Sequence, residues 1–319
     1  MKISLVIPVL NEEETIEKLL QALADQTKKP DEIIFVDGGS KDKTVKKMEN
    51  GKWKMEKDNI RFKIFVKPGA SIAQGRNYGI ERTEREIIVM TDAGCIPHHD
   101  WFEKITQPFT DPKIDVVAGF YKMTGESIFQ RCLTCYLGIL PERLNPKTFL
   151  PSARSIAFKK EIWQKVGGFS EKLTKAGEDT LFNYQAKRLG AKFVVVPEAL
   201  VDWEIDKRFF EVTKKFYIYA KGDGQAGIWW HPSKRFSTHN LKISSIYGRY
   251  LVGGTLFITG FFSNFFWILL IVLFLGYLFW AIFKNYKFVK KWQAIFYLPA
   301  IQIASDFLVM AGFLAGVLR

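Results

Sequence analysis

One stretch of this chain limits its possible folds more than any other. From Leu251 to Phe283 there are 33 consecutive residues without a charged side chain. A second apolar stretch, from Gln293 to Leu318, contains Asp306 as its only charged residue. About 20 helical residues cross the ~30 Å hydrocarbon core of a bilayer, so both stretches are long enough to span a membrane. We therefore expect an integral membrane protein.

The rest of the chain has a different composition. Residues 1–239 contain 39 Lys and Arg and 32 Asp and Glu, whereas residues 240–319 contain seven basic residues and one acid. The chain is 48% hydrophobic, which excludes a disordered or fibrous protein. Its three cysteines are too few for a disulfide framework. This split predicts a charged front domain joined to an apolar tail.

The lysines of the tail indicate how it crosses the bilayer. Residues 284–291 contain four lysines, and short basic loops favour the cytoplasmic side. Three spans satisfy this rule, near residues 246–262, 265–283 and 293–316, and two spans are the alternative. The N-terminal apolar run leads directly into acidic residues, unlike a signal peptide. We expect a multi-pass protein of the cell membrane with its front domain in the cytoplasm.

The first 200 residues alternate between strand-like and helix-like patterns. Runs rich in Val, Ile and Phe occur at residues 3–10, 32–39, 61–67, 86–94, 115–123 and 191–203. Such nearly continuous apolar runs are typical of parallel strands covered on both faces. After the first run, apolar residues recur with helical spacing, and Asn11 is expected to cap this helix. These residues are Ile16, Leu19, Leu20 and Leu23. The pattern predicts a doubly wound α/β domain, whose ligands bind beyond the carboxyl ends of the strands.

Polar or glycine-rich segments follow four of these strands. Each alone is typical of a solvated turn. The carboxyl ends of parallel strands lie on one edge of a sheet, so the four together predict a ligand site there. The segments are Asn11-Glu12, Asp37-Gly38-Gly39-Ser40, Lys67-Pro68-Gly69 and Thr91-Asp92-Ala93-Gly94.

Six segments carry a resemblance to a known family. They are VIPVLNEEETIEKLL, IIFVDGGSKDKT, GASIAQGRNYGI, IIVMTDAGC, VGGFSE and AGEDTLF. In this order they resemble the family 2 glycosyltransferases, nucleotide-sugar enzymes of the GT-A fold. The resemblance covers residues 1–205 and implies an α/β domain with a doubly wound mixed sheet. We expect an amphipathic juxtamembrane connector at 206–245 and a membrane domain of two or three transmembrane helices at 246–319.

The resemblance implies a site for a nucleotide-diphosphate sugar. Pro8, Val9 and Glu12 would flank the base and ribose, and Asp37 would accept a hydrogen bond from a ring N–H of the base. Gly39 lets the backbone turn closely around the ring. The alternative for Asp37 is a simple turn former.

The resemblance implies five further residues that bind the nucleotide sugar, with Arg76 and Asn77 next to its diphosphate. They are Lys67, Arg76, Asn77, Asp92 and Ala93. Arg76 and Asn77 match the family's Ala-Arg-Asn helix, where Arg76 either faces phosphate or pairs with an acid.

A divalent cation, Mg²⁺ or Mn²⁺, is implied at Asp92, which lies at the family's Asp-x-Asp motif. The cation would neutralise the departing diphosphate. Gly94 replaces the second Asp, so Asp92 holds the metal alone or with help from Asp202 or Glu204. The alternative is that metal binding is weak or dispensable.

The resemblance also implies an inverting mechanism. Such a transfer needs a base that takes the proton of the acceptor hydroxyl. Asp179 is the implied base and Glu178 its helper. Alternatively, the two acids stabilise the dipole at a helix start.

The apolar tail and a basic aromatic stretch at 207–221 suit a membrane surface. We therefore expect membrane lipids as partners and a lipid or lipid-linked glycan as acceptor, and no nucleic acid. A polyprenyl-phosphate glycosyl synthase and a processive polysaccharide synthase are alternatives, although the Gln-x-x-Arg-Trp segment of such polysaccharide synthases is absent. A non-catalytic membrane scaffold is the alternative from another class. GDGQAG at 222–227 is expected to form a turn and not a dinucleotide site.

Overall fold

The computed structural model describes residues 2–173, 175–206, 208–229 and 239–318. The chain divides into two compact units. Unit 1 comprises the chain up to Lys122 and Leu144–Glu204, and unit 2 comprises Met123–Arg143 and the chain from Ile205 onward. The expected division at 205 and 245 stays a prediction. Lys207 of the basic aromatic stretch and part of the expected connector lie outside the described residues.

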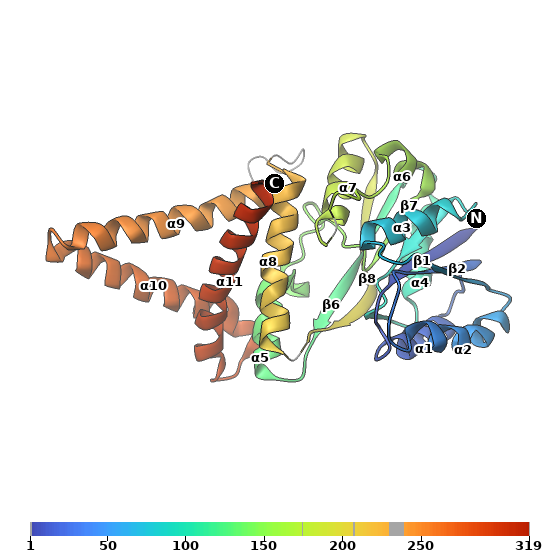
Figure 1. The fold of residues 1–319 in the computed structure, drawn as a ribbon, viewed down its shortest axis with the longest axis horizontal. Helices are drawn as coiled ribbons and strands as arrows, with labels where there is room; N and C mark the ends of the chain where they lie inside the picture. Colours follow the sequence, from blue (N-terminus) through green and yellow to red (C-terminus); the bar gives the residue numbers. More distant parts are fainter. Residues whose placement is uncertain (1, 174, 207, 230–238, 319) are drawn as a thin grey trace. The chain divides into compact units, whose positions relative to one another are not determined.

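Unit 1 is built on one mixed sheet of eight strands, in the order β3-β2-β1-β4-β7-β6-β8-β5 (Figure 1). The pairs β3–β2, β2–β1 and β1–β4 are parallel. Strand β7 runs antiparallel to β4 and β6, and β5 runs antiparallel to β8. The strands are β1 Ile3–Val9, β2 Glu32–Asp37, β3 Arg61–Val66, β4 Ile87–Met90, β5 Cys95–Pro97, β6 Val116–Thr124, β7 Ile156–Lys159 and β8 Phe193–Glu204. The predicted doubly wound mixed α/β fold is confirmed.

Helices cover both faces of this sheet, which explains the continuous apolar runs: all residues of β1 and β2 are buried. Side chains of α3, α6 and α7 share one hydrophobic core with β1, β2, β4 and β7. The helical elements of unit 1 are α1 Ile16–Ala24, α2 Thr44–Glu56, α3 Ile72–Glu81, α4 Trp101–Thr106, α6 Lys160–Val166, α7 Glu178–Arg188 and the 3₁₀ helix Gln107–Thr110.

The predicted apolar face of α1 is confirmed, but its predicted cap is wrong. Ile16, Leu19, Leu20 and Leu23 are all buried. The helix begins after Thr15, four residues later than an Asn11 cap would require. Asn11 instead adopts φ 54°, in the left-handed region that Asn tolerates, and its Oδ1 accepts a hydrogen bond from the Lys41 amide. Asn11 therefore shapes the turn after β1.

Unit 2 is helical. It contains α5 Ile128–Leu137, the 3₁₀ helix Pro141–Arg143, α8 Phe209–Ala226, α9 His239–Gly260, α10 Asn264–Val289 and α11 Ala294–Val317. The predicted turn at 222–227 is wrong for its first five residues, which continue α8. A β-carbon at Gly224 would lie 2.7 Å from the Phe313 carbonyl, and one at Gly312 would lie 2.2 Å from the Tyr217 carbonyl. These glycines allow α8 and α11 to pack closely.

Two helices, α10 and α11, are long and apolar enough to cross a membrane. They contain the spans predicted near 265–283 and 293–316. The third predicted span, 246–262, overlaps α9, which does not have this composition; α9 includes Lys242 and Arg249. Only 6% of the most apolar window of α10 is buried, so its hydrophobic surface faces outward. The position of these helices in a membrane stays a prediction.

Candidate active site

Backbone hydrogen bonds join the ends of the first three strands. The Gly38 amide donates to the Val9 carbonyl (2.9 Å), and the Gly69 amide donates to the Gly38 carbonyl (2.9 Å). The Asn11 amide donates to Ser40 Oγ (2.8 Å). The strand order reverses direction between β1 and β4, which is where ligands bind in sheets of this kind. The polar turns thus lie on one edge of the sheet, as the sequence predicts.

Glu12 connects the fourth strand end to this edge. A β-carbon added to Gly94 would lie 3.5 Å from a carboxylate oxygen of Glu12. The position at which the family has its second Asp therefore faces an acid already present. Thr15 Oγ1 donates a hydrogen bond to Glu12 Oε2 (2.6 Å) and orients it. Because Gly94 has no side chain, Glu12 supplies the carboxylate that lies next to this position.

Asp37 forms the turn after β2. Its Oδ2 accepts hydrogen bonds from the Gly39 and Ser40 amides, both at 2.9 Å, and its Oδ1 accepts one from the Ser40 hydroxyl. The side chain is buried, and Gly39 has φ 95°, which favours glycine. Asp37 thus shapes the turn after β2, and its contact with a base stays a prediction.

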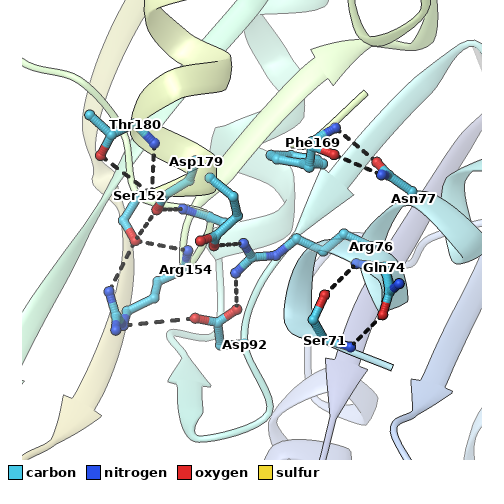
Figure 2. A network of polar contacts seen from close by, with 12 residues as sticks. Ser71, Gln74, Arg76, Asn77, Asp92, Ser152, Arg154, Phe169, Asp179 and Thr180 are labelled. Atoms are coloured by element: carbon cyan, nitrogen blue, oxygen red, sulfur yellow. Dashed lines mark hydrogen bonds and ion pairs between the residues drawn. The ribbon is translucent and has the colours of Figure 1, made fainter. Parts of the chain in front are cut away.

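Arg76 lies between two acids, as Figure 2 shows. Its Nη2 is 2.8 Å from Asp92 Oδ1, and its Nη1 bonds to Glu178 Oε1. The side chain is only 2% exposed. Burial alone would lower the pKa of Arg76, but the charges of Asp92 and Glu178 raise it above its ordinary value. The alternative in which Arg76 pairs with an acid is thus the one observed.

Asn77 has a structural role. Its Nδ2 donates to the Phe169 carbonyl (2.8 Å) and Glu171 (3.0 Å), and its Oδ1 accepts from the Phe169 amide (2.8 Å) and Trp163 (3.1 Å). These four bonds use the full hydrogen-bonding capacity of the amide. This argues against its expected contact with the diphosphate.

Arg154 is a site residue that the sequence pattern did not reveal. Its Nε lies 3.9 Å from Asp92 Oδ2, and its guanidinium lies 4.1 Å from the ring centre of Trp203. Stacking of this kind fixes the direction of the guanidinium. Arg154 belongs to none of the six segments that resemble the family, and only the tertiary structure brings it to Asp92.

Within the described residues, Asp92 does not belong to a preformed cluster of metal ligands. Across the described part of the chain, no group of three or more His, Cys, Asp or Glu side chains is placed to hold a metal ion. Asp92 instead faces the guanidinium groups of Arg76 and Arg154. Asp202, the expected helper ligand, has its Oδ2 3.2 Å from Nε2 of His98. The structure therefore gives no support to a metal site formed by Asp92 and Asp202.

Glu178 and Asp179 begin α7, after Gly177 with φ 91°. Asp179 Oδ2 accepts hydrogen bonds from the Ala153 amide (3.1 Å) and the Ser152 hydroxyl (3.2 Å), which orient its carboxylate (Figure 2). Burial raises the pKa of Glu178, and the charge of Asp179 acts in the same direction, whereas Arg76 opposes them. The acids also lie where they stabilise the helix dipole, as the alternative proposes.

The other expected donor residues line the same edge. Pro8 and Val9 are buried in β1, with Pro8 opposite Val36 of β2. Ala93 is buried beside Asp92. Lys67 Nζ lies 4.9 Å from the ring centre of Tyr78. Their contacts with a nucleotide stay predictions.

Comparison with known families identifies the chain. The model for Glycosyl transferase family 2 matches residues 4–164. The chain belongs to this family. It is therefore a glycosyltransferase, and the resemblance noted in the sequence is confirmed.

Two individual glycosyltransferases are similar to this chain at low sequence identity. Glycosyltransferase AglE of Haloferax volcanii is 27% identical over 232 residues, which cover 71% of this chain and 74% of that protein. O-antigen chain rhamnosyltransferase RfbN of Salmonella typhimurium is 26% identical over 63% of this chain and 66% of its own length.

Solved structures confirm the GT-A fold. Mannosyltransferase PcManGT from Pyrobaculum calidifontis, in complex with GDP-Man and Mn²⁺, has a TM-score of 0.74 at 16% identity and covers 99% of this chain and 87% of its own. S. aureus TarS in complex with UDP-GlcNAc has a TM-score of 0.52 at 18% identity, and the match covers 80% of this chain and 81% of the TarS chain.

Proposed function

We propose that this glycosyltransferase moves a sugar, with inversion, from a nucleotide-diphosphate sugar to a lipid or lipid-linked acceptor at the cytoplasmic face of a membrane. The donor class is supported by solved neighbours that hold GDP-Man and UDP-GlcNAc. The membrane location is supported by α10 and α11. The observation that carries the proposal is that one guanidinium, that of Arg76, joins Asp92 to Glu178, next to Asp179.

On the donor side, the leaving nucleoside diphosphate carries negative charge that must be neutralised. Arg154 lies beside Asp92, held by stacking on Trp203. A planar guanidinium binds phosphate oxygens with two parallel hydrogen bonds. We assign Arg154 to the diphosphate, while buried Arg76 holds Asp92 and Glu178 in place.

On the acceptor side, Asp179 is the base. The hydrogen bonds from Ser152 and Ala153 aim its carboxylate. Asp179 Oδ1 also accepts hydrogen bonds from the Thr180 amide (2.7 Å) and the Thr180 hydroxyl (3.4 Å). An acceptor hydroxyl would replace the longer of these two bonds and give its proton to Oδ1. If the acceptor is instead a phosphate monoester, whose second pKa is about 6, its oxygen is already anionic and needs no base.

Nucleotide binding tests this proposal. The purified full chain would be heated with UDP, GDP, CMP or dTDP, each with Mn²⁺ and with EDTA. We expect one nucleoside diphosphate to raise the melting temperature, and the rise to persist in EDTA because the cations at Asp92 are arginines.

Arg154→Gln should weaken this effect at least tenfold in nucleotide concentration. Arg188→Gln is the matched control, since Arg188 is an exposed arginine at the end of α7. A chain that responds to none of the nucleotides would overturn the proposal and favour a scaffold.

A further inference from the structure

Ser152 lies between two residues of unit 1, the proposed base Asp179 and Arg154, which we assign to the diphosphate. Its hydroxyl donates a hydrogen bond to Asp179 Oδ2 (3.2 Å). Arg154 Nη1 donates to the same hydroxyl oxygen (3.0 Å), and the Arg154 amide donates to it in a longer bond (3.4 Å). Figure 2 shows this chain of contacts, which continues from Arg154 to Asp92. One serine therefore connects the acceptor side of the site to the donor side.

The two bonds from Arg154 decide where the hydroxyl proton of Ser152 points. A serine hydroxyl has one proton and two lone pairs. Because two N–H groups of Arg154 are directed at the oxygen, the proton is left for Asp179. A hydroxyl that accepts a bond from a cation also becomes a stronger donor. The bond from Ser152 to Asp179 thus depends on the guanidinium of Arg154.

The bonds to Asp179 divide its two carboxylate oxygens between two tasks. Oδ2 accepts from the Ser152 hydroxyl and the Ala153 amide, which together fill its two lone-pair sites. Oδ1 has the shorter bond from the Thr180 amide and the longer one from the Thr180 hydroxyl. Without the Ser152 hydroxyl, an acceptor would meet either oxygen. With it, only Oδ1 is available for the proton.

The backbone around Ser152 is held by contacts that do not involve its hydroxyl. The Ser155 amide donates to the Ser152 carbonyl (3.1 Å), and the buried Ser155 hydroxyl donates to a carbonyl of β8 (2.9 Å). Asn183 of α7 donates to the Pro151 carbonyl (2.7 Å). The loss of the Ser152 hydroxyl alone should therefore leave the turn and α7 in place.

Arg154 can hold Ser152 and a phosphate at the same time. Its side chain carries five N–H donors. The guanidinium lies 4.1 Å from the ring centre of Trp203 and 5.1 Å from that of Tyr121, and these rings fix its direction. A phosphate that binds Arg154 would therefore meet a group already joined to the base.

We propose that Arg154 acts on the base through Ser152, so that the contact with the diphosphate and the aim of Asp179 form one coupled unit. Ser152 is the positioning residue of this unit. The inference rests on the proposed function, which uses the bond between Ser152 and Asp179, and adds that Arg154 controls this bond.

Hydrolysis of the donor tests the coupling without a known acceptor. Water attacks the anomeric carbon, the bond from this carbon to the diphosphate oxygen breaks, and the water gives its proton to Asp179 Oδ1. The purified full chain would be incubated with GDP-mannose, UDP-glucose, UDP-GlcNAc or dTDP-rhamnose, and the released nucleoside diphosphate measured. This gives kcat at a saturating concentration of the donor and KM for the donor.

Ser152→Ala should lower kcat by about tenfold or more and leave KM within about twofold, because the hydroxyl contacts the base and not the donor. Ser152→Thr keeps a hydroxyl and should restore most of kcat. Ser170→Ala is the matched control, since Ser170 is also partly buried and lies before α7. A Ser152→Ala chain with the wild-type kcat, or a Ser152→Thr chain as slow as Ser152→Ala, would overturn the proposal.

A double-mutant cycle tests the control by Arg154. Arg154→Met should raise KM and lower kcat. Adding Ser152→Ala to Arg154→Met should lower kcat by less than about threefold more, because residues that act through one another are not additive. Independent effects, in which the two losses of kcat multiply, would overturn the coupling.

Asp179→Asn in the same assay separates the two proposals. Hydrolysis that falls in Asp179→Asn but not in Ser152→Ala overturns only the role of Ser152. Hydrolysis that Asp179→Asn leaves unchanged, or a wild-type chain that hydrolyses none of the donors, overturns the proposed base and the coupling with it.

Discussion

Each unit contains a partly or fully buried arginine beside carboxylates, and the two networks differ in charge and access. In unit 1, Arg76 is 2% exposed and bonds to two carboxylates, Asp92 and Glu178. In unit 2, Arg249 is 35% exposed and pairs with Asp306, while Lys284 adds a second cation. In the Arg76 network one guanidinium joins two carboxylates, and these contacts can hold catalytic groups in place. The Arg249 network joins two cations to one carboxylate.

The largest expected effect comes from removing the proposed catalytic base in unit 1. Asp179→Asn removes the proposed base but keeps an oxygen that can accept the bonds from Ser152 and Ala153. Transfer to a hydroxyl acceptor should fall by about 10²–10⁴-fold. Transfer to a polyprenyl phosphate should fall less than tenfold, because that acceptor is already anionic.

Both rates would be measured with a radiolabelled donor, and Asp100→Asn, at a partly exposed residue before α4, is the control. Equal rates for Asp179→Asn and wild type on a hydroxyl acceptor would contradict the role of Asp179 as base.

Removing each arginine compares the networks directly. Arg76→Met leaves Glu178 without a cation and Asp92 with Arg154 alone, and breaking a buried pair in this way costs about 3–5 kcal/mol of folding stability. Arg249→Met should cost less, because Asp306 keeps hydrogen bonds from Tyr277 and Gln302. Urea unfolding of both variants in detergent measures the difference. A larger loss for Arg249→Met would contradict the greater contribution of the buried Arg76 pairs to folding stability.

Placing an aspartate at Gly94 tests metal binding beside Asp92. Gly94→Asp would bring a second carboxylate against Glu12. Two like charges about 4 Å apart repel by roughly 1–4 kcal/mol near a protein surface. We expect a lower melting temperature in EDTA, restored by Mn²⁺ in the variant alone. A wild-type chain that Mn²⁺ stabilises equally would show that Glu12 and Asp92 already bind the cation.

The smallest expected effect concerns pH. Burial raises the pKa of Glu178 above its ordinary 4.5, so the folded chain holds this proton at pH values where the unfolded chain has released it. Between the unfolded and folded pKa values, the free energy of unfolding should therefore decrease as pH rises. Glu178→Gln should flatten this slope, as measured by thermal unfolding between pH 4 and 8. An unchanged slope would mean that Arg76 outweighs burial.

Much of unit 1 could be predicted from local patterns. Continuous apolar runs specified the buried strands, and helical spacing specified the face of α1, because a single sequence period decides which side chains are buried. The predicted Asn11 cap of α1 was wrong because the Asn11 side chain accepts a hydrogen bond from the amide of Lys41, thirty residues away. No local pattern reports such a contact.

The sequence by itself determined the family, the α/β sheet and the two helices long enough for a membrane, because these depend on periodicity, length and ordered motifs. The tertiary structure decided which charges meet. Arg154 reaches Asp92, Asp202 turns to His98, and Arg249 reaches Asp306. A charged side chain is compatible with many partners in sequence, and only the packing of strands and helices selects one, since leaving it buried without a partner costs too much free energy.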